Sequence, residues 1–128
     1  MTTTLAEDEL LTEVRLPLLA PDTRFGFYEF NRRAGDFALA IALTVHRLED
    51  GRIVEPRLAV GGAEPRTRRI AAGEQALDGR APTAESFANA AERVAAAIDP
   101  MEDAQTSAEY RRDLVRTVAR RAMERSLT

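Results

Sequence analysis

Two β-prone runs flank a short turn signal near the middle of the chain. Residues 37–48 and 52–60 are rich in aliphatic side chains, and Glu49-Asp50-Gly51 separates them. Asp-Gly between two such runs is a strong hairpin signal, because glycine accepts a positive φ at no steric cost. The sequence therefore predicts an antiparallel hairpin, and any fold for this chain has to contain it.

The first hairpin strand alternates large and small side chains. One face carries the large apolar set, Leu39, Ile41, Leu43 and Val45, and the other carries Ala38, Ala40, Ala42, Thr44 and His46. We expect the large apolar set to face the helices of the domain. The small set would then form a face that another surface can approach closely. For His46 we favour a solvent-facing or interface position over a functional role, since a single histidine cannot form a histidine metal cluster.

Weaker signals surround the hairpin. Before it, the sequence predicts a short strand at residues 14–16 that stops at Pro17, a turn at Pro21-Asp22, and an aromatic strand at residues 25–30. After it, Gly61-Gly62 ends the second strand and residues 65–69 form a basic loop. Residues 70–71 could return to the sheet, and residues 74–77 form at most a helical turn.

The last third of the chain has helical periodicity. Thr83 is the expected N-cap of a first helix, whose buried stripe is Phe87, Ala91, Val94 and Ile98. Thr106 and Glu109 fit a capping box for a second helix, with Tyr110, Leu114, Val118 and Ala122 on one stripe and Val115 and Met123 beside it. Strands followed by helices predict an α+β fold. We expect one domain, residues 1–128, with an antiparallel sheet of three to four strands packed against about three C-terminal helices in a two-layer sandwich.

Composition excludes several kinds of chemistry. The chain has 128 residues and no cysteine, so disulfides, thiolate metal sites and cysteine nucleophiles are ruled out. All 18 Lys+Arg residues are arginine, which removes lysine Schiff-base chemistry. The net charge of -3 argues against a nucleic-acid partner. No apolar run reaches the roughly 20 residues of a membrane span, and the N-terminus does not resemble a signal peptide, so we expect a cytoplasmic protein.

Two arginine clusters admit more than one interpretation. The final helix carries Arg111, Arg112, Arg116, Arg120, Arg121 and Arg125 interleaved with Glu109, Asp113 and Glu124. This spacing favours a solvated face with i,i+3 and i,i+4 ion pairs, and a docking face for an acidic partner is the alternative. Arg66, Arg68 and Arg69 could bind a phosphate, but such a loop is more often simply solvent-exposed.

The segment Asn31-Arg32-Arg33-Ala34-Gly35-Asp36 lies between two β-prone runs. It places two arginines, a glycine and an aspartate at the end of the predicted sheet. Loops held at strand ends by a rigid scaffold often contact ligands. On these residues alone, a structural turn and a ligand-contacting loop both remain open.

Four segments, in this order and spacing, carry a resemblance to a known family. They are FYEFNRRAGDFA (27–38), AVGGAEPR (59–66), EQALDG (74–79) and residues 103–123, which include SAEYRR (107–112) and RRA (120–122). Together they resemble the C-terminal domain of the FAD-binding middle subunit of the carbon monoxide dehydrogenase and xanthine dehydrogenase family of molybdenum hydroxylases. The resemblance covers residues 10–123, and it implies an antiparallel sheet packed against about three helices.

The resemblance also implies a cofactor and partners. In that family the flavin subunit takes electrons from an iron–sulfur subunit, which receives them from a molybdenum subunit. By resemblance, Arg32, Arg33 and Asp36 contact or frame the isoalloxazine ring, with Asn31 and Tyr28 as lesser candidates. A fixed charge there would tune the flavin potential, and a polar loop could gate access of the final electron acceptor. No catalytic residue and no metal ligand is expected.

One departure from the family limits this interpretation. The family holds FAD mainly through an N-terminal FAD-binding region with glycine-rich loops, which is absent from this sequence. We therefore expect the isolated chain to bind FAD weakly or not at all. Two functions remain open: a component that completes a flavin subunit, with an FAD-binding region or subunit as its partner, and a free-standing, non-enzymatic interaction or homodimerisation module.

Overall fold

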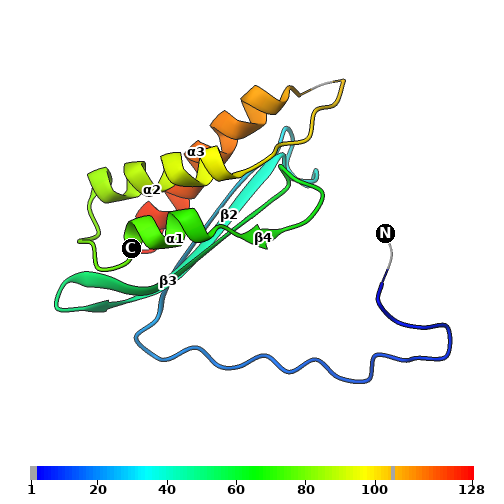
Figure 1. Cartoon of the computed structure of the whole chain (residues 1–128), viewed down its shortest axis with the longest axis horizontal. Helices are drawn as coiled ribbons and strands as arrows, with labels where there is room; N and C mark the ends of the chain where they lie inside the picture. Colours follow the sequence, from blue (N-terminus) through cyan, green and yellow to red (C-terminus); the bar gives the residue numbers. More distant parts are fainter. Residues whose placement is uncertain (1–2, 105) are drawn as a thin grey trace.

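Four strands and three helices form two layers. The computed structural model describes residues 3–104 and 106–128. The elements are β1 (Arg24–Phe30), β2 (Ala40–Glu49), β3 (Arg52–Gly61), β4 (Arg68–Arg69), α1 (Ala71–Leu77), α2 (Ala84–Ala97) and α3 (Ala108–Arg125). The strands form one antiparallel sheet in the order β1-β2-β3-β4, and all three helices lie on one side of it (Figure 1). The predicted α+β two-layer sandwich is confirmed. None of the helices described is long and apolar enough to cross a membrane.

The central hairpin is confirmed. Glu49 of β2 pairs with Arg52 of β3, which leaves Asp50 and Gly51 as a two-residue turn. Both turn residues have positive φ, 49° and 72°, as a type I′ turn requires. The register between β2 and β3 then shifts between Val45 and Arg47, which marks a β-bulge.

The two faces of β2 are the reverse of the prediction. Ala40 and Ala42 are fully buried against the helices, whereas Leu43 on the opposite face is 43% exposed. The cause is the close approach of α3 to β1. A Cβ added at Gly26 would lie 1.8 Å from the carbonyl oxygen of Ala122. Because the helix backbone lies almost on the sheet here, only small residues fit between them, and the large apolar side chains point away from the core.

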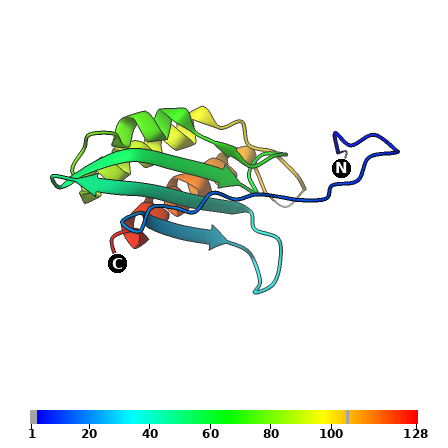
Figure 2. The same ribbon diagram turned by 90° about the horizontal axis from the view of Figure 1, so that it is seen from below.

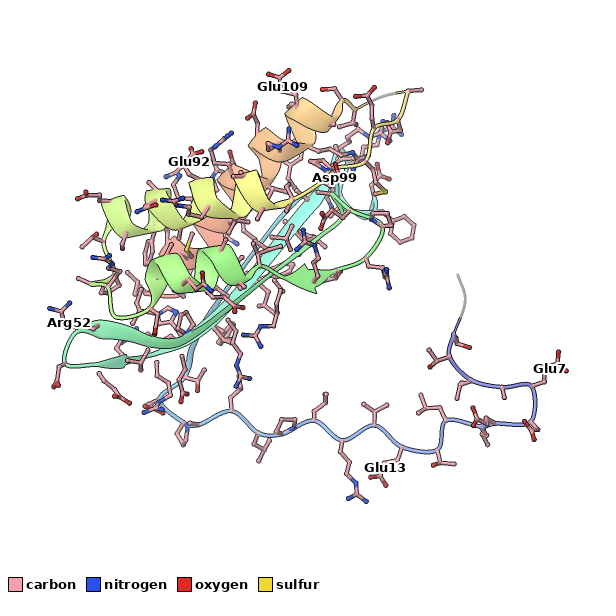
Figure 3. All side chains as sticks on the ribbon, viewed as in Figure 1. Glu7, Glu13, Arg52, Glu92, Asp99 and Glu109 are labelled. Carbon is pink, nitrogen blue, oxygen red and sulfur yellow. The ribbon has the colours of Figure 1, made fainter. Side chains whose placement is uncertain are left out.

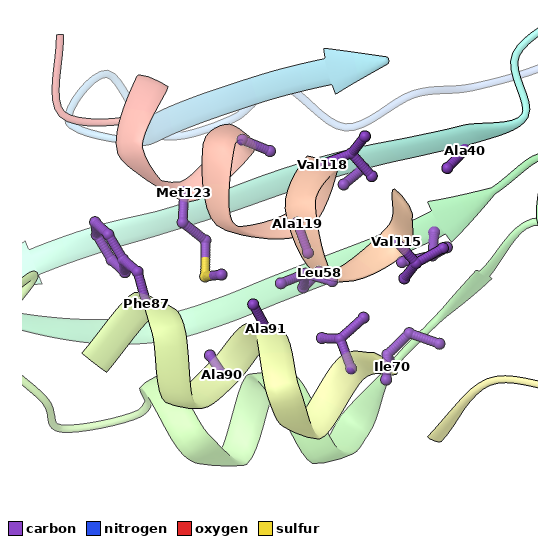
Figure 4. Close-up of a cluster of buried hydrophobic side chains, with 14 of the residues drawn as sticks. Ala40, Leu58, Ile70, Phe87, Ala90, Ala91, Val115, Val118, Ala119 and Met123 are labelled. Carbon is purple, nitrogen blue, oxygen red and sulfur yellow. The ribbon is translucent and has the colours of Figure 1, made fainter. Parts of the chain in front are cut away.

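Helices α2 and α3 complete the core (Figure 4). The predicted stripe of α2 is confirmed, since Phe87, Ala91, Val94 and Ile98 are all buried. The predicted α3 set is buried from Leu114 onward, with Val115, Val118, Ala122 and Met123. Tyr110 is the exception at 47% exposed, so its assignment to the buried stripe was wrong.

Helix starts and short elements agree with the sequence in part. Thr83 caps α2, and its side chain and that of Ser86 satisfy each other's backbone N–H groups. The cap of α3 is Ser107, whose hydroxyl accepts from the Tyr110 N–H at 3.2 Å, so the predicted Thr106 capping box was wrong by one residue. The return to the sheet is β4, just before residues 70–71, and α1 is longer than the single turn expected at residues 74–77.

The N-terminal segment, residues 3–22, forms no strand. The strand predicted at residues 14–16 is therefore wrong for this chain, because no neighbouring strand provides hydrogen-bond partners. The predicted turn at Pro21-Asp22 is confirmed, and the Thr23 N–H donates to the Ala20 carbonyl at 2.9 Å. In both ribbon views the segment runs on the side of the sheet opposite the helices (Figures 1 and 2).

Candidate functional site

Residues 31–39 connect β1 to β2 at one end of the sheet. The Leu39 N–H donates to the Phe30 carbonyl at 2.8 Å and closes the base of the connection. Within it, the Asp36 N–H donates to the Arg33 carbonyl at 3.1 Å, and Gly35 has a φ of 88°. These backbone bonds define a tight turn, as the alternation of β-prone and polar segments predicts.

Four of the predicted site residues lie together in this turn. The Asn31 side-chain amide donates to the Asp36 carbonyl at 3.4 Å, so the two ends of the segment face each other. Asn31 is half-buried, whereas Arg32, Arg33 and Asp36 are exposed. The loop therefore presents charged groups to its surroundings from a backbone fixed by internal hydrogen bonds.

Tyr28 belongs to a different group of residues. It lies on the helix-facing side of β1, and its ring packs beneath the guanidinium groups of Arg121 (5.0 Å) and Arg125 (4.5 Å) of α3. Arg121 also donates to the Tyr28 hydroxyl, and Arg125 donates to the Phe27 carbonyl at 3.3 Å. The structure thus joins Tyr28 to α3, a pairing that the sequence analysis missed. The signal available was two arginines four residues apart on a helix with an aromatic strand to cover.

Arg111 is a buried cation that braces the candidate loop. Its side chain is 6% exposed, so it does not lie on a solvated face as expected. One guanidinium nitrogen donates to the carbonyls of Gly62 (3.0 Å) and Leu39 (3.4 Å), and the other binds Asp103 at 2.5 Å. A buried guanidinium needs such partners to offset its lost hydration. Arg111 therefore ties α3 to the start of β2, where the candidate loop ends.

Arg116 and Arg120 of α3 form ion pairs of the kind that the sequence predicts. Arg120 pairs with Glu124 at 2.7 Å, and Arg116 pairs with Asp113 and with Glu92 of α2. These i,i+3 and i,i+4 bridges confirm the expected ion pairs on the exposed face.

The second basic loop has a structural role at two of its three arginines. Arg68 binds both carboxylate oxygens of Glu64 (2.7 and 3.0 Å), and Arg69 binds both of Glu74 (2.8 Å each). The hydrogen bond from Arg68 holds the pKa of Glu64 below its usual value. Because these guanidinium groups are already occupied by carboxylates, this loop is a poor phosphate site.

His46 is buried, not solvent-facing. Its side chain is 2% exposed on the helix-facing side of β2, and its Nε2 has no hydrogen-bond partner among the described residues. Burial lowers the pKa of His46, and the positive charge of Arg24 lowers it further. The expected solvent or interface position was wrong, because α3 covers the small-residue face.

The described residues suit one part of FAD and not another. Among residues 3–104 and 106–128, no cluster of three potential ligands could hold a metal ion. The exposed polar loop at residues 31–36 can hydrogen-bond the edge of a flavin ring. The paired glycines cannot cradle a pyrophosphate, since a Cβ at Gly61 would meet Thr67 Oγ1 at 2.6 Å and one at Gly62 would meet the Ala38 carbonyl at 2.7 Å. The chain's own atoms already occupy the space at both glycines.

Comparison with known proteins identifies the family. The profile of the CO dehydrogenase flavoprotein C-terminal domain matches residues 25–126. The chain is 37% identical to the nicotine 6-hydroxylase medium subunit of Paenarthrobacter nicotinovorans and 30% identical to the carbon monoxide dehydrogenase medium chain of Hydrogenophaga pseudoflava. Each alignment spans 121 residues and covers 94% of this chain but 42% of the relative.

A solved structure supports the same assignment. Carbon monoxide dehydrogenase from Hydrogenophaga pseudoflava superposes with a TM-score of 0.90 at 31% identity, covering 98% of this chain and 44% of that chain. The chain thus spans about two-fifths of the length of these relatives, and the resemblance inferred from its four segments is confirmed. The chain belongs to the CO dehydrogenase flavoprotein C-terminal domain family.

Proposed function

We propose that this chain is the C-terminal component of the flavin subunit of a molybdenum hydroxylase-type oxidoreductase, in which residues 31–36 frame one side of the FAD ring. When bound, FAD supplies a ring that passes electrons from iron–sulfur clusters to a final acceptor. The partners in this proposal are an FAD-binding region, an iron–sulfur subunit and a molybdenum subunit. The absence of cysteine fits a cytoplasmic assembly of this kind.

The observation that carries the proposal is the braced loop between β1 and β2. The Phe30–Leu39 hydrogen bond closes its base, and buried Arg111 holds the Leu39 carbonyl from α3. Charged groups on such a support keep one position relative to a neighbouring surface. A cation held beside the flavin ring favours the reduced, more electron-rich ring, and an anion disfavours it. Arg33 and Asp36 therefore act on the potential in opposite directions.

In this proposal the FAD site is divided: this domain contacts the ring, and the partner region binds the pyrophosphate. Since Gly61 and Gly62 pack against the chain itself, the pyrophosphate has to be held by the partner region. We expect no saturable FAD binding when the isolated chain is titrated at micromolar concentrations. Micromolar or tighter affinity for the isolated chain would contradict this division.

The test uses a grafted subunit. Residues of this chain replace the 121 matched residues of the full-length nicotine 6-hydroxylase medium subunit, and the flavin reduction potential of the graft is measured by spectroelectrochemistry. Arg33→Ala should lower the potential and Asp36→Ala should raise it. Arg93→Ala removes an exposed arginine of α2 and is the matched control, for which no change is expected. Equal potentials in all four proteins would refute the role of the loop.

A further inference from the structure

The side of the sheet opposite the helices carries an apolar patch bordered by the charged residues Glu29 and Arg57, although antiparallel sheets usually show a polar outer face. We call it the open face and define it by Phe25 and Phe27 of β1, Ile41, Leu43 and Val45 of β2, and Ala59 of β3. The strand register makes these residues neighbours, since Phe27 lies opposite Leu43, which in turn lies opposite Ala59. Phe25 is 67% exposed, and Phe27 and Leu43 are each 43% exposed. A contiguous exposed apolar patch of this kind marks an interaction surface.

The N-terminal segment adds a second apolar surface on the same side of the molecule. Three of its leucines are largely exposed: Leu10 is 83% exposed, Leu16 is 84% and Leu18 is 98%. In Figure 3 the segment around Glu7 and Glu13 lies apart from the sheet and the helices, with a turn at Glu7. Leu10, Val14 and Leu16 would share one face of an extended strand, although Leu11 and Thr12 interrupt the strict alternation.

One ion pair anchors the end of the segment at a corner of the sheet. Arg47 of β2 binds Asp22 at 3.0 Å and Glu49 at 2.5 Å, which anchors the end of the segment beside β2. Beyond this corner, residues 17–20 line a shallow hollow together with Val45 and Arg57. The rest of the segment diverges from the sheet on the side opposite the helices, which is the side of the open face (Figures 1 and 2).

The length of the solved relative provides a candidate partner for these two apolar surfaces. The superposition with TM-score 0.90 includes 98% of this chain but only 44% of the relative's chain, so the relative contains a large part that this domain does not match. The domain profile itself begins only at residue 25. Because the segment touches its own domain only near residues 17–22 and leaves its other apolar side chains exposed, it is available for contacts with that unmatched part.

We infer that the open face and the N-terminal segment are two sides of one docking surface for the FAD-binding region of a medium subunit. The segment adds to an edge strand of that region through its backbone, with Leu10, Val14 and Leu16 entering its core. The open face covers an apolar surface of the same region. Residues 31–36 follow β1 at the end of the open face, so a region docked there also reaches the candidate loop. This inference rests on the proposed function.

Hydrogen–deuterium exchange on the isolated chain and on the grafted subunit tests the docking surface. In the isolated chain, amides of residues 10–16 should exchange as in an unfolded peptide, because among the described residues these amides donate no hydrogen bond. In the graft they should be protected at least 100-fold, together with reduced accessibility of the open face. FAD retained after gel filtration is measured on the same samples, so that docking and flavin binding are read separately.

The four outcomes separate the two proposals. If the graft shows amide protection and retains FAD, both the docking surface and the proposed function are supported. If it shows protection but retains no FAD, the docking surface is supported and the proposed function is refuted. If the graft retains FAD without amide protection, only the docking surface is refuted. If it shows neither protection nor retained FAD, both proposals are refuted. Concentration-dependent protection of the open face in the isolated chain would also overturn the inference, because the occupant would then be a second copy.

Point variants test the open face directly. Phe27→Glu and Leu43→Glu should each reduce FAD retention in the graft at least tenfold, and Arg93→Glu should leave it unchanged. Both apolar side chains are exposed in the isolated chain, so these variants should fold there with an unaltered circular dichroism spectrum. If either variant disturbs folding, the milder Leu43→Ala with the exchange measurement replaces it. Wild-type retention in folded Phe27→Glu and Leu43→Glu grafts would refute a role for the open face.

Discussion

Replacing Arg111 by methionine should destabilise the domain strongly and loosen the candidate loop. The substitution keeps most of the side-chain volume but removes hydrogen bonds to the carbonyls of Gly62 and Leu39 and the ion pair with Asp103. Hydrogen bonds to a charged group contribute about 1.5–3 kcal/mol each, and breaking a buried ion pair costs about 3–5 kcal/mol. Asp103 is half-exposed, so it regains hydration when unpaired, and we take about 3 kcal/mol as the net loss.

Equilibrium urea unfolding measures this loss, and amide exchange of residues 37–39 reports on the loop. About 3 kcal/mol corresponds to a fall in Tm of roughly 12 °C for a domain of this size. Arg112→Met changes the neighbouring, half-buried arginine and should cost less than about 0.5 kcal/mol. If Arg111→Met were as stable as Arg112→Met, the bracing role of Arg111 would be wrong.

Three further predictions concern stability. Gly26→Ala should lower the free energy of unfolding in urea by about 3 kcal/mol, because the added Cβ overlaps the Ala122 carbonyl. Gly79→Ala is the control: Gly79 has a φ of 70° and open space around it, so this change should cost only about 1 kcal/mol. Equal losses would contradict the close approach of α3. Glu74→Ala should lower the free energy of unfolding by about 2 kcal/mol, because Glu74 accepts from the Leu58 N–H at 2.9 Å and pairs with Arg69. Glu74→Gln keeps an acceptor oxygen, so it should lose less than half of that free energy. For His46 the folded-state pKa lies below the unfolded value of 6.5, so the unfolded chain binds more protons and stability should fall as pH drops below about 6.5. Urea midpoints between pH 7.5 and 5.5 measure this fall, His46→Leu should abolish it, and a flat wild-type profile would refute it.

Local signals in the sequence were sufficient for the hairpin, for α2 and for the loop between β1 and β2. Asp50-Gly51 and the Thr83 cap act through nearest neighbours, so their structure follows from short stretches of chain. The position of residues 31–36 followed from the β-prone runs on either side. These elements account for the correct fold class and for the placement of four of the five candidate residues.

The errors arose where a distant part of the chain decides the outcome. The orientation of β2 depends on how closely α3 approaches Gly26, and no property of β2 itself encodes that distance. Burial of Arg111 depends on carbonyls at Leu39 and Gly62, and the position of Tyr28 depends on Arg121 and Arg125. The strand predicted at residues 14–16 was wrong because a strand needs a partner, and none of the described strands pairs with this segment.

Purification of the tagged chain from its own host under native conditions is the most direct test of its role as a flavin-subunit component. The account predicts a yellow complex in which the chain is accompanied by stoichiometric flavin, by iron–sulfur absorbance and by larger polypeptides. A colourless homodimer without flavin or iron would contradict it and would favour a free-standing interaction module.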